Sequence, residues 1–425
     1  MDGRDYREYR LNNGLLVALE RAPSKTIAGS LGVNTGTVDE KPGREGTAHF
    51  LEHVLMTSST QQHSSDELRE AIGSFGYYNA GTSAVEVVFD GKILPMDLTK
   101  FLEVTSAIAF SSCFDQEKIK EERSRVLREI AGKFGQPSYY DWKRFSNEIY
   151  GKEHPISLEV LGASQSVNAI TREDLREFHS KEFAANNMEL VLAGDLPSDM
   201  DKLIRKYFGD KPSGNVRGRF NAPYIDRMDR RVIHSISAPD LLMEGDEENS
   251  NSEIWLNVFV PPRTHPDRIK LGILTGILGI GSESYIFKEV SQAGGLSYDI
   301  RGNYNGRNNI GQLIIQGRVL ARKQEEALDK IFQCFRKIQD EPLDESLFLR
   351  RKRLIQYGLA SGLETNYDRV SSIKGFLEHG ITDEQLIAEL EEVKSGEITE
   401  VARKYLPRNR DDNYALMIRD PLKGN

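Results

Sequence analysis

The segment His49-Phe50-Leu51-Glu52-His53 lies in a stretch, residues 47–56, whose pattern is typical of an α-helix with Thr47 as its N-cap. Residues four apart on a helix face the same side, so His49 and His53 can direct both imidazoles at one ion. Glu52 follows His49 by three residues and lies on nearly the same face. The segment therefore predicts a helix that presents three chemically active side chains together.

These residue types are those of a catalytic zinc site. The order H-x-x-E-H is the reverse of the HExxH motif of zinc peptidases. Two neutral imidazoles suit Zn²⁺, which in catalysis needs a third protein ligand and an open position for water. Zinc would polarise the scissile carbonyl and lower the pKa of its bound water, and Glu52 would take the water's proton and pass it to the leaving amine. The competing explanation is a surface helix with solvated side chains, since so short a motif arises by chance in about one such chain in a hundred.

The third ligand is expected far from this motif in the sequence. A strongly charged helix is predicted over residues 115–133, and its candidate glutamates are Glu117, Glu121, Glu122 and Glu129. Glu122 and Glu129 share a face with Val126, so that face is partly buried. A carboxylate on such a face needs a partner, whereas a solvated charged face would need none. The residues alone leave the choice of ligand open.

Length and composition limit the fold and the function. A chain of 425 residues is expected to form two domains of roughly 200 residues each. A chain with a net charge of −9 lacks the excess of basic residues that binds nucleic acid, and it would be repelled by an anionic membrane. No apolar run is long enough to span a membrane, and the charged N-terminus is unlike a secretory signal. With only two cysteines, Cys113 and Cys334, in no metal-type spacing, we expect a cytoplasmic protein without disulfides.

The order of the predicted elements indicates an α+β fold with two homologous domains, each a mainly antiparallel sheet with helices packed on one face. We expect a zinc-bearing domain at 1–212, a turn-rich linker at 213–230 and a second domain at 231–425 without metal ligands. In the first domain we predict a hairpin around Asn13-Gly14, strands at 27–34, 77–90 and 188–193, and helices at 47–56, 66–74, 95–110, 115–133, 171–182 and 198–208. In the second we predict strands at 254–260, 296–304 and 311–318, and helices at 268–278, 284–292, 323–339 and 343–361.

The sequence resembles the pitrilysin/insulysin family of inverted zincins, in particular its shorter members related to the mitochondrial processing peptidase subunits. The resemblance covers nearly the whole chain. Residues 46–55 (GTAHFLEHVL) are similar to the family's active-site helix, residues 78–83 (YNAGTS) to its substrate-edge strand and residues 122–130 (ERSRVLREI) to its distal helix.

This resemblance implies a role for each matching residue. Glu129 stands at the family's spacing for the third zinc ligand, and Glu122 matches the carboxylate that supports the ligands. Asn79 and Ala80 match positions that bind an extended peptide as an added strand; their structural alternative is a plain entry from turn to strand. The resemblance also implies one zinc per chain and an unfolded peptide as substrate. It further implies that the two halves of a chain face each other like a clamshell, and that two chains form a dimer whose four domains enclose a chamber.

The second domain departs from the family pattern at one position. Residues 287–298 match a segment that carries a substrate-gripping Arg and Tyr in the family. Tyr298 is present, although it could instead be a half-buried strand aromatic. Ser291 stands at the Arg position, and Arg301 and Arg307 are the nearby arginines.

Three functions are consistent with these residues. The first is a zinc endopeptidase that acts as a homodimer on unfolded or short peptides. The second is the zinc-bearing subunit of a heterodimer that is inactive without a related partner carrying Arg and Tyr. The third is a non-catalytic scaffold of the same fold, which ranks last because this chain retains every zinc residue.

Overall fold

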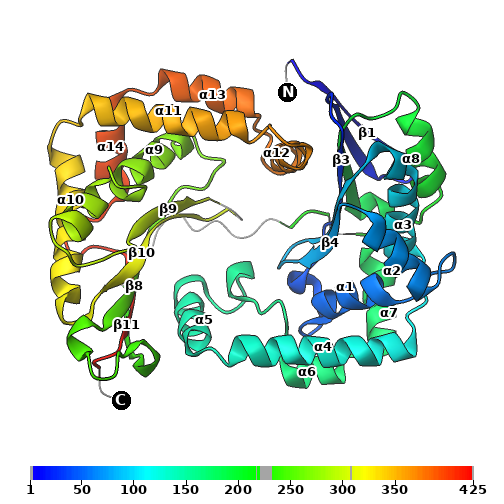
Figure 1. The fold of residues 1–425 in the computed structure, drawn as a ribbon, viewed down its shortest axis with the longest axis horizontal. Helices are drawn as coiled ribbons and strands as arrows, with labels where there is room; N and C mark the ends of the chain where they lie inside the picture. Colours follow the sequence, from blue (N-terminus) through cyan, green and yellow to red (C-terminus); the bar gives the residue numbers. More distant parts are fainter. Residues whose placement is uncertain (1–2, 217, 221–231, 307–308, 424–425) are drawn as a thin grey trace. The chain divides into compact units, whose positions relative to one another are not determined.

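The computed structural model describes residues 3–216, 218–220, 232–306 and 309–423, and their contacts form two compact units (Figure 1). Unit 1 comprises residues 1–136, 153–220 and 362–380, and unit 2 comprises residues 137–152, 221–361 and 381–425. Each unit has its own sheet and its own hydrophobic core. No helix in the described part of the chain is long and apolar enough to cross a membrane. Most of the predicted linker, from 221 onward, lies outside the described residues, as does Arg307.

Unit 1 is built on a six-stranded sheet in the order β1-β2-β6-β3-β5-β4. Its strands are β1 Asp5–Arg10, β2 Leu16–Arg21, β3 Ile27–Val33, β4 Tyr77–Thr82, β5 Val87–Ile93 and β6 Met188–Gly194. All neighbouring strands are antiparallel except β2 and β6, which are parallel. The predicted hairpin at Asn13-Gly14 is confirmed: Gly14 has a φ of 87°, and β1 pairs with β2.

The main helices of unit 1 cover this sheet. They are α1 Thr47–Thr57, α2 Ser65–Ser74, α3 Leu98–Phe110, α4 Gln116–Phe134, α6 Ser164–Ala169, α7 Arg172–Glu182, α8 Met200–Phe208 and α12 Asn366–His379. Short 3₁₀ turns, η1 Thr37–Asp39, η2 Pro95–Asp97, η3 Pro155–Ser157 and η4 Ala185–Asn187, connect them. Helices α1, α3 and α8 pack into one core with β2, β3, β5 and β6.

Unit 2 repeats this plan. Its sheet has the order β7-β11-β8-β10-β9, formed by β7 Val232–Ser237, β8 Asn251–Val260, β9 Arg301–Asn305, β10 Gly311–Leu320 and β11 Ala415–Asp420. The first pair is again parallel and the other pairs are antiparallel, so the order corresponds to β2-β6-β3-β5-β4 strand by strand. The predicted α+β fold with two homologous domains is therefore confirmed. The helices of unit 2 are α5 Pro137–Tyr150, α9 Arg268–Gly279, α10 Gln324–Asp340, α11 Glu345–Ser361, α13 Asp383–Glu392 and α14 Ser395–Tyr405.

Two helices pack in the unit that is formed mainly by the other half of the sequence. The predicted division of the chain at a single linker, 213–230, therefore does not describe where these two helices pack. Helix α5 belongs to unit 2, where the Trp142 ring lies 4.9 Å from the Trp255 ring and Phe145 is buried against Val232 and Met417. Helix α12 belongs to unit 1 and covers the sheet face opposite α1, so the helices of this unit lie on both faces of its sheet and not on one face as predicted. Its apolar side chains, Val370 and Ile373, join a cluster with Ala18, Ala28, Val191 and Ala193. An apolar helix face does not encode which sheet it will cover, so the unit in which α5 and α12 pack cannot be predicted from the sequence pattern.

Three local expectations differ from the structure. The single strand expected at 77–90 is a hairpin, β4 and β5, whose turn is closed by a hydrogen bond from Ser83 N to Glu86 O of 2.8 Å. Thr47 is not an N-cap but the first residue of α1, whose N-cap is Gly46. The strand expected at 296–304 begins only at Arg301, because Tyr298 and its neighbours form a bend.

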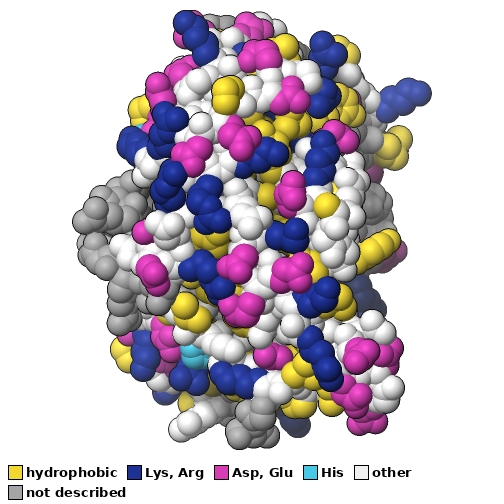
Figure 2. All heavy atoms as spheres, turned by 90° about the vertical axis from the view of Figure 1, so that its left-hand side faces the viewer, with side chains coloured by type: hydrophobic (Ala, Val, Ile, Leu, Met, Phe, Trp, Pro, Cys, Tyr) yellow, Lys and Arg dark blue, Asp and Glu magenta, His cyan; other side chains and the backbone are white. Residues whose placement is uncertain are grey.

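Charged side chains of both signs mix on the surface. On the face shown in Figure 2, Lys and Arg side chains are interspersed with Asp and Glu side chains. Such a mixture produces no strong field of one sign over that face.

We predict that Ile373→Ala lowers the free energy of unfolding by about 2–4 kcal/mol, because it empties a fully buried position between α12 and the sheet of unit 1. Denaturant unfolding would measure the change. Ser371→Ala, at an exposed position on the same helix, is the control and should have little effect. Equal stabilities of the two variants would contradict the packing of α12 in unit 1.

Candidate metal centre

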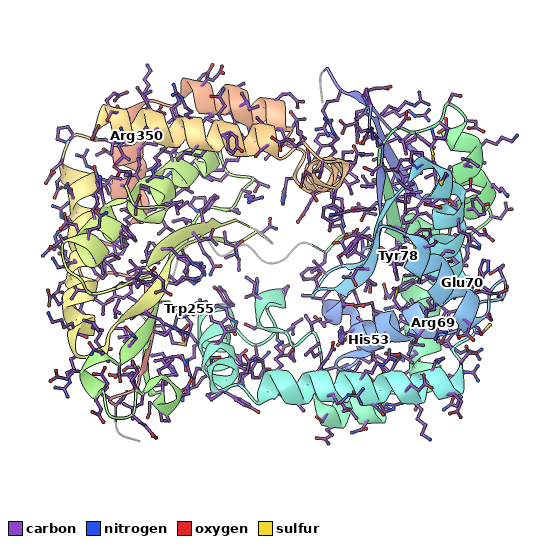
Figure 3. All side chains as sticks on the ribbon, in the orientation of Figure 1. His53, Arg69, Glu70, Tyr78, Trp255 and Arg350 are labelled. Carbon is purple, nitrogen blue, oxygen red and sulfur yellow. The ribbon has the colours of Figure 1, made fainter. Side chains whose placement is uncertain are left out.

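Helix α1 fixes the positions of the two histidines and of Glu52. Its apolar residues, Phe50, Leu51, Val54 and Leu55, are fully buried in the core of unit 1. Since that face is anchored, the other face is directed toward α4. There the rings of His49 and His53 lie 4.7 Å apart, as their spacing of one helical turn predicts. Figure 3 labels His53 on this helix.

Helix α4 brings Glu129 to the two histidines. Glu129 Oε2 lies 3.6 Å from His49 Nε2 and 3.6 Å from His53 Nε2. The three ligand atoms all lie within 4.8 Å of one another. The Glu129 side chain is 49% exposed, so one side of this group is open to solvent or substrate.

The geometry of this group fits a zinc ion. Distances of 3.6 Å are long for hydrogen bonds. They are close to the separation of about 3.3 Å between ligand atoms that each lie about 2.0–2.1 Å from a tetrahedral zinc. Two imidazole nitrogens and one carboxylate oxygen are also a donor set that zinc uses in catalytic sites. Of the four glutamates left open by the sequence, the structure places Glu129 beside both histidines.

Burial controls the protonation of the histidines. Burial lowers the pKa of His49 to about 4, and the neighbouring His53 adds to this effect. His49 is therefore neutral near pH 7, the form that binds a metal. Burial also acts to lower the pKa of His53, but its hydrogen bond to Glu122 and the nearby charges of Glu52 and Glu129 outweigh burial and raise it.

Glu122 orients His53 from behind. Its Oε2 lies 3.1 Å from His53 Nδ1, and its Oε1 is 2.9 Å from Arg125 Nη1. The carboxylate is only 1% exposed, so its position is fixed by these two partners. A proton held on Nδ1 by Glu122 leaves the lone pair on Nε2, the atom that faces Glu129.

Glu52 lies beside the group without joining its three ligand atoms. Its Oε2 accepts a hydrogen bond of 2.8 Å from Thr82 Oγ1, at the end of β4. Burial, supported by the charge of Glu129, raises the pKa of Glu52. Thr82 was not predicted, because nothing in the sequence relates it to a residue 30 positions earlier.

Strand β4, which carries Asn79 and Ala80, is an edge strand that pairs with β5 on one side. Ser83 is hydrogen-bonded to Glu86, and bonded and non-bonded pairs alternate along an antiparallel ladder. By this alternation Asn79 bonds to β5, whereas Ala80 directs its backbone N–H and C=O to the open edge. The Asn79 side chain is exposed, and Ala80 packs against the core.

Glu40 is a further residue at this site that sequence reasoning missed. Its carboxylate accepts hydrogen bonds from Gly46 N (2.9 Å) and Ala48 N (2.8 Å), at the N-terminus of α1. Gly46 has no side chain to cap the helix and has a φ of 92°. Glu40 therefore supplies the cap from outside the helix. The available signal was an acidic residue shortly before a helix whose N-cap lacks a side chain.

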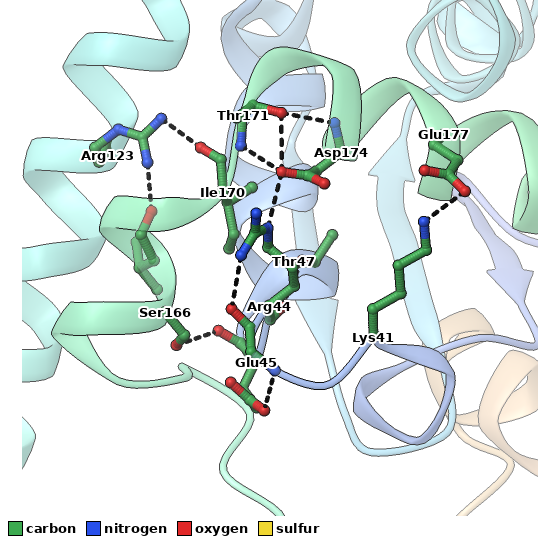
Figure 4. Close-up of polar contacts among 12 residues, drawn as sticks. Lys41, Arg44, Glu45, Thr47, Arg123, Ser166, Ile170, Thr171, Asp174 and Glu177 are labelled. Carbon is green, nitrogen blue, oxygen red and sulfur yellow. Dashed lines mark hydrogen bonds and ion pairs between the residues drawn. The ribbon is translucent and has the colours of Figure 1, made fainter.

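Polar contacts also fix the loop before α1 and join α4 to its surroundings (Figure 4). Arg44 Nε lies 3.0 Å from Asp174 Oδ2 on α7, and Ser166 Oγ on α6 donates to Glu45 O at 2.7 Å. From α4, Arg123 donates to Ile170 O at 2.8 Å, and its guanidinium lies 5.0 Å from the Phe50 ring centroid. These contacts fix the start of α1 and the position of α4 beside it.

The second-domain residues belong to unit 2. Tyr298 lies in a bend before β9 and is 96% exposed, so the alternative of a half-buried strand aromatic is wrong. Ser291 lies in the short helix η7 Phe287–Gln292, and its buried Oγ has no hydrogen-bond partner among the described residues. The residues that the structure brings together around α1 and α4 are His49, His53, Glu129, Glu122 and Glu52.

Two family models match most of the chain. The model described as insulinase (peptidase family M16) matches residues 16–137, which include the whole group around α1 and α4. The model described as peptidase M16 inactive domain matches residues 169–355.

Relatives and solved structures extend the likeness. An uncharacterized zinc protease of Mycobacterium tuberculosis is 28% identical over 95% of this chain and 91% of its own length. An uncharacterized zinc protease of Bacillus subtilis is 23% identical over 98% of both chains. A protease from Helicobacter pylori has a TM-score of 0.80 and 19% identity, covering 98% of this chain and 100% of its own. A peptidase M16 inactive domain from Pseudomonas fluorescens has a TM-score of 0.83 and 16% identity over 99% of both. At these identities the two solved structures show the fold alone.

We predict that Glu122→Gln weakens zinc binding about 10–100-fold, because the amide cannot hold the His53 Nδ1 proton as a carboxylate does. Competition with a chelator of known affinity would measure this change. Glu121→Gln is the matched control, since Glu121 is the preceding residue on α4 and its side chain is 53% exposed. A variant at 122 that bound zinc as tightly as the control would show that Glu122 does not support the ligands.

We also predict a pH-dependent effect of Glu40→Gln. Burial raises the pKa of Glu40 from 4.5 to about 8. The Glu40 carboxyl group therefore binds its proton more tightly in the folded chain than in the unfolded chain. The stability that this residue contributes is fully present below pH 4.5 and is lost as the pH rises through about 8. The wild type should thus lose stability relative to the glutamine variant, by at most about 1.4 kcal/mol per pH unit. Parallel curves of unfolding free energy against pH would contradict this assignment.

Proposed function

This chain belongs to the M16 peptidase family of insulinase-like proteins, and we propose that it is a zinc metalloendopeptidase that cleaves unfolded or short peptides. The observation that carries the proposal is the group formed by His49, His53 and Glu129, with Glu122 behind it and Glu52 beside it. The relatives named as zinc proteases support the same class of activity.

His49, His53 and Glu129 would hold one zinc per chain. When bound there, zinc supplies Lewis-acid polarisation of a peptide carbonyl and lowers the pKa of water. Glu52 has no ligand task, and its Oε2 is positioned by Thr82. Its raised pKa brings this carboxylate toward the range in which a group can both accept and return a proton. We therefore assign to Glu52 the transfer of a proton from water to the leaving amine.

The open edge of β4 would hold the substrate in extended form. A peptide that adds a strand there forms main-chain hydrogen bonds to Ala80, while its side chains alternate between the two faces of the sheet. The Asn79 side chain would lie along one of those faces. This mode needs an unfolded segment, since a folded chain offers few free backbone groups. Tyr298 would hydrogen-bond a substrate carbonyl, as the family resemblance implies.

A second function, the zinc-bearing subunit of a heterodimer, is favoured by one specific observation. Ser291 stands where the family carries a substrate-gripping arginine, and a short hydroxyl cannot replace a guanidinium that binds a carbonyl. Under this alternative the chain holds zinc but cleaves only with a related partner that carries Arg and Tyr. Cleavage by the purified chain alone would establish a self-sufficient peptidase, and cleavage that needs the partner would decide for the heterodimer.

We predict that Glu52→Gln retains one zinc per chain and loses at least about 100-fold in cleavage of a quenched-fluorescent, unstructured peptide. The reason is that the amide cannot accept the water's proton, while the three ligands are untouched. Metal analysis and the cleavage rate, each measured with and without chelator, would test this outcome.

Glu129→Gln is the contrasting variant and should lose zinc itself. A Glu52→Gln protein that cleaved at the wild-type rate would remove Glu52 from its assigned role. Absence of chelator-sensitive cleavage in the wild type, alone and with a partner, would leave the scaffold function.

A further inference from the structure

Exposed large apolar side chains gather at one place in unit 1. Among the described residues of this unit they are Tyr77 (39% exposed), Leu94 (51%) and Met96 (82%). Tyr77 begins β4, Leu94 directly follows the end of β5, and Met96 lies in η2. We call these three residues the distal patch. Isolated exposed apolar side chains are ordinary, but a group confined to one end of one hairpin suggests a binding surface.

The distal patch is built on a fixed framework. Tyr77 lies opposite Lys92 in the β4–β5 ladder, and Leu94 is two residues beyond Lys92, so it points to the same face. Lys92 Nζ lies 5.4 Å from the Tyr77 ring centroid and 4.3 Å from that of Tyr367 on α12. The Tyr77 and Tyr367 rings are themselves 6.4 Å apart, edge to face. Tyr77 is therefore held in place by α12.

Strand β4 connects the distal patch to the metal centre. Thr82, at the far end of the strand, is hydrogen-bonded to Glu52, and Tyr77 lies five residues away. This separation corresponds to roughly 17 Å along an extended strand. A peptide paired with the open edge of β4 would thus extend from the site of cleavage to the distal patch.

We propose that the distal patch is a specificity subsite for an apolar side chain of the substrate, about four to six residues from the scissile bond. The inference deepens the proposed peptidase function and rests on it. Since side chains alternate between faces, the selected residue is one that lies on the same face as Tyr77. The Lys92 ammonium beside this position disfavours a basic residue there, so the substrate class is an unfolded peptide with an apolar residue at this distance.

A second copy of the chain is a less suitable occupant. Even if each side chain offered the roughly 250 Å² of a large aromatic residue, the three would offer at most roughly 750 Å², and they are only partly exposed. A stable interface buries about 800 Å² on each partner. One apolar side chain of a peptide, in contrast, needs only a small surface at a fixed distance from the reacting bond.

The test uses unstructured peptides that share one cleavage sequence and carry a single Phe or a single Ser at successive positions on either side of it. Fluorescence anisotropy with the full-length Glu52→Gln protein measures binding of each peptide without hydrolysis. We expect about tenfold tighter binding of the Phe peptide when Phe lies about four to six residues from the scissile bond on one side. In the same background, Leu94→Ser combined with Met96→Ser should reduce this ratio to about one.

Met243→Ser is the matched control, because Met243 is 47% exposed in unit 2, and it should keep the tenfold ratio. The proposal is overturned if the double variant keeps that ratio or if binding does not depend on the position of Phe. A wild-type dimer that becomes a monomer in the double variant, measured by light scattering, would assign the distal patch to self-association and also overturn it. Chelator-sensitive cleavage of the Ser peptide by the wild type is a separate readout, so failure of the peptidase function can be distinguished from failure of the subsite.

Discussion

The packing of α1 against α4 is the contact on which the candidate site depends. Helix α1 supplies His49 and His53 by local spacing, but neither Glu129, the candidate third ligand, nor Glu122, the carboxylate behind His53, is close to them in the sequence. Both come from α4, whose buried residues Ile119, Val126 and Ile130 join the same core as the apolar face of α1. A slide of α4 by one residue would rotate Glu122 and Glu129 by about 100° away from the histidines. The contacts of Arg123 on α4 with Ile170 and with the Phe50 ring resist such a slide, while Arg44 and Glu40 hold the start of α1 in place.

The sequence predicted those parts of the site that depend on spacing along one helix. The pairing of His49 with His53 follows from a separation of four residues, whereas the spacing alone left four glutamates as candidates for the third ligand, and the family resemblance was needed to choose Glu129. Glu40 and Thr82 escaped prediction because each acts across a tertiary contact. The β4–β5 hairpin was read as one strand because its turn contains Ser, Ala and Val, without the Gly, Pro or Asn that usually mark a turn.

The sequence predicted that the second half repeats the element order of the first. It did not predict the unit in which each helix packs. In both sheets the one parallel pair lies at the equivalent position, so the two domains share one topology. Helix α5 comes from the first half of the sequence but packs in unit 2, and α12 comes from the second half but packs in unit 1. Apolar contacts and buried ion pairs hold each helix there. On α12, Arg369 pairs with Glu20, which is 1% exposed. On α5, Asp141 lies 2.9 Å from the buried Arg419, which also binds Asp240 and Glu253. Burying these ion pairs costs desolvation, but a helix packed elsewhere would leave Glu20 or Arg419 buried without its partner.

The charges around α1 give a physical reason why this group should prefer a dication. Glu52 and Glu129 converge beside His53, and the charge of Glu129 contributes to the raised pKa of Glu52. Burial keeps the neighbouring His49 neutral. Glu122 is offset by Arg125 and His53, and the charge of His53 also acts on Glu52, but Glu52 and Glu129 still repel each other. In a chain without a metal ion, their repulsion opposes the packing of α1 on α4. A dication held by Glu129 and the two imidazole nitrogens would offset both carboxylates at once. The packing of α1 on α4 and the binding of such an ion would therefore stabilise each other.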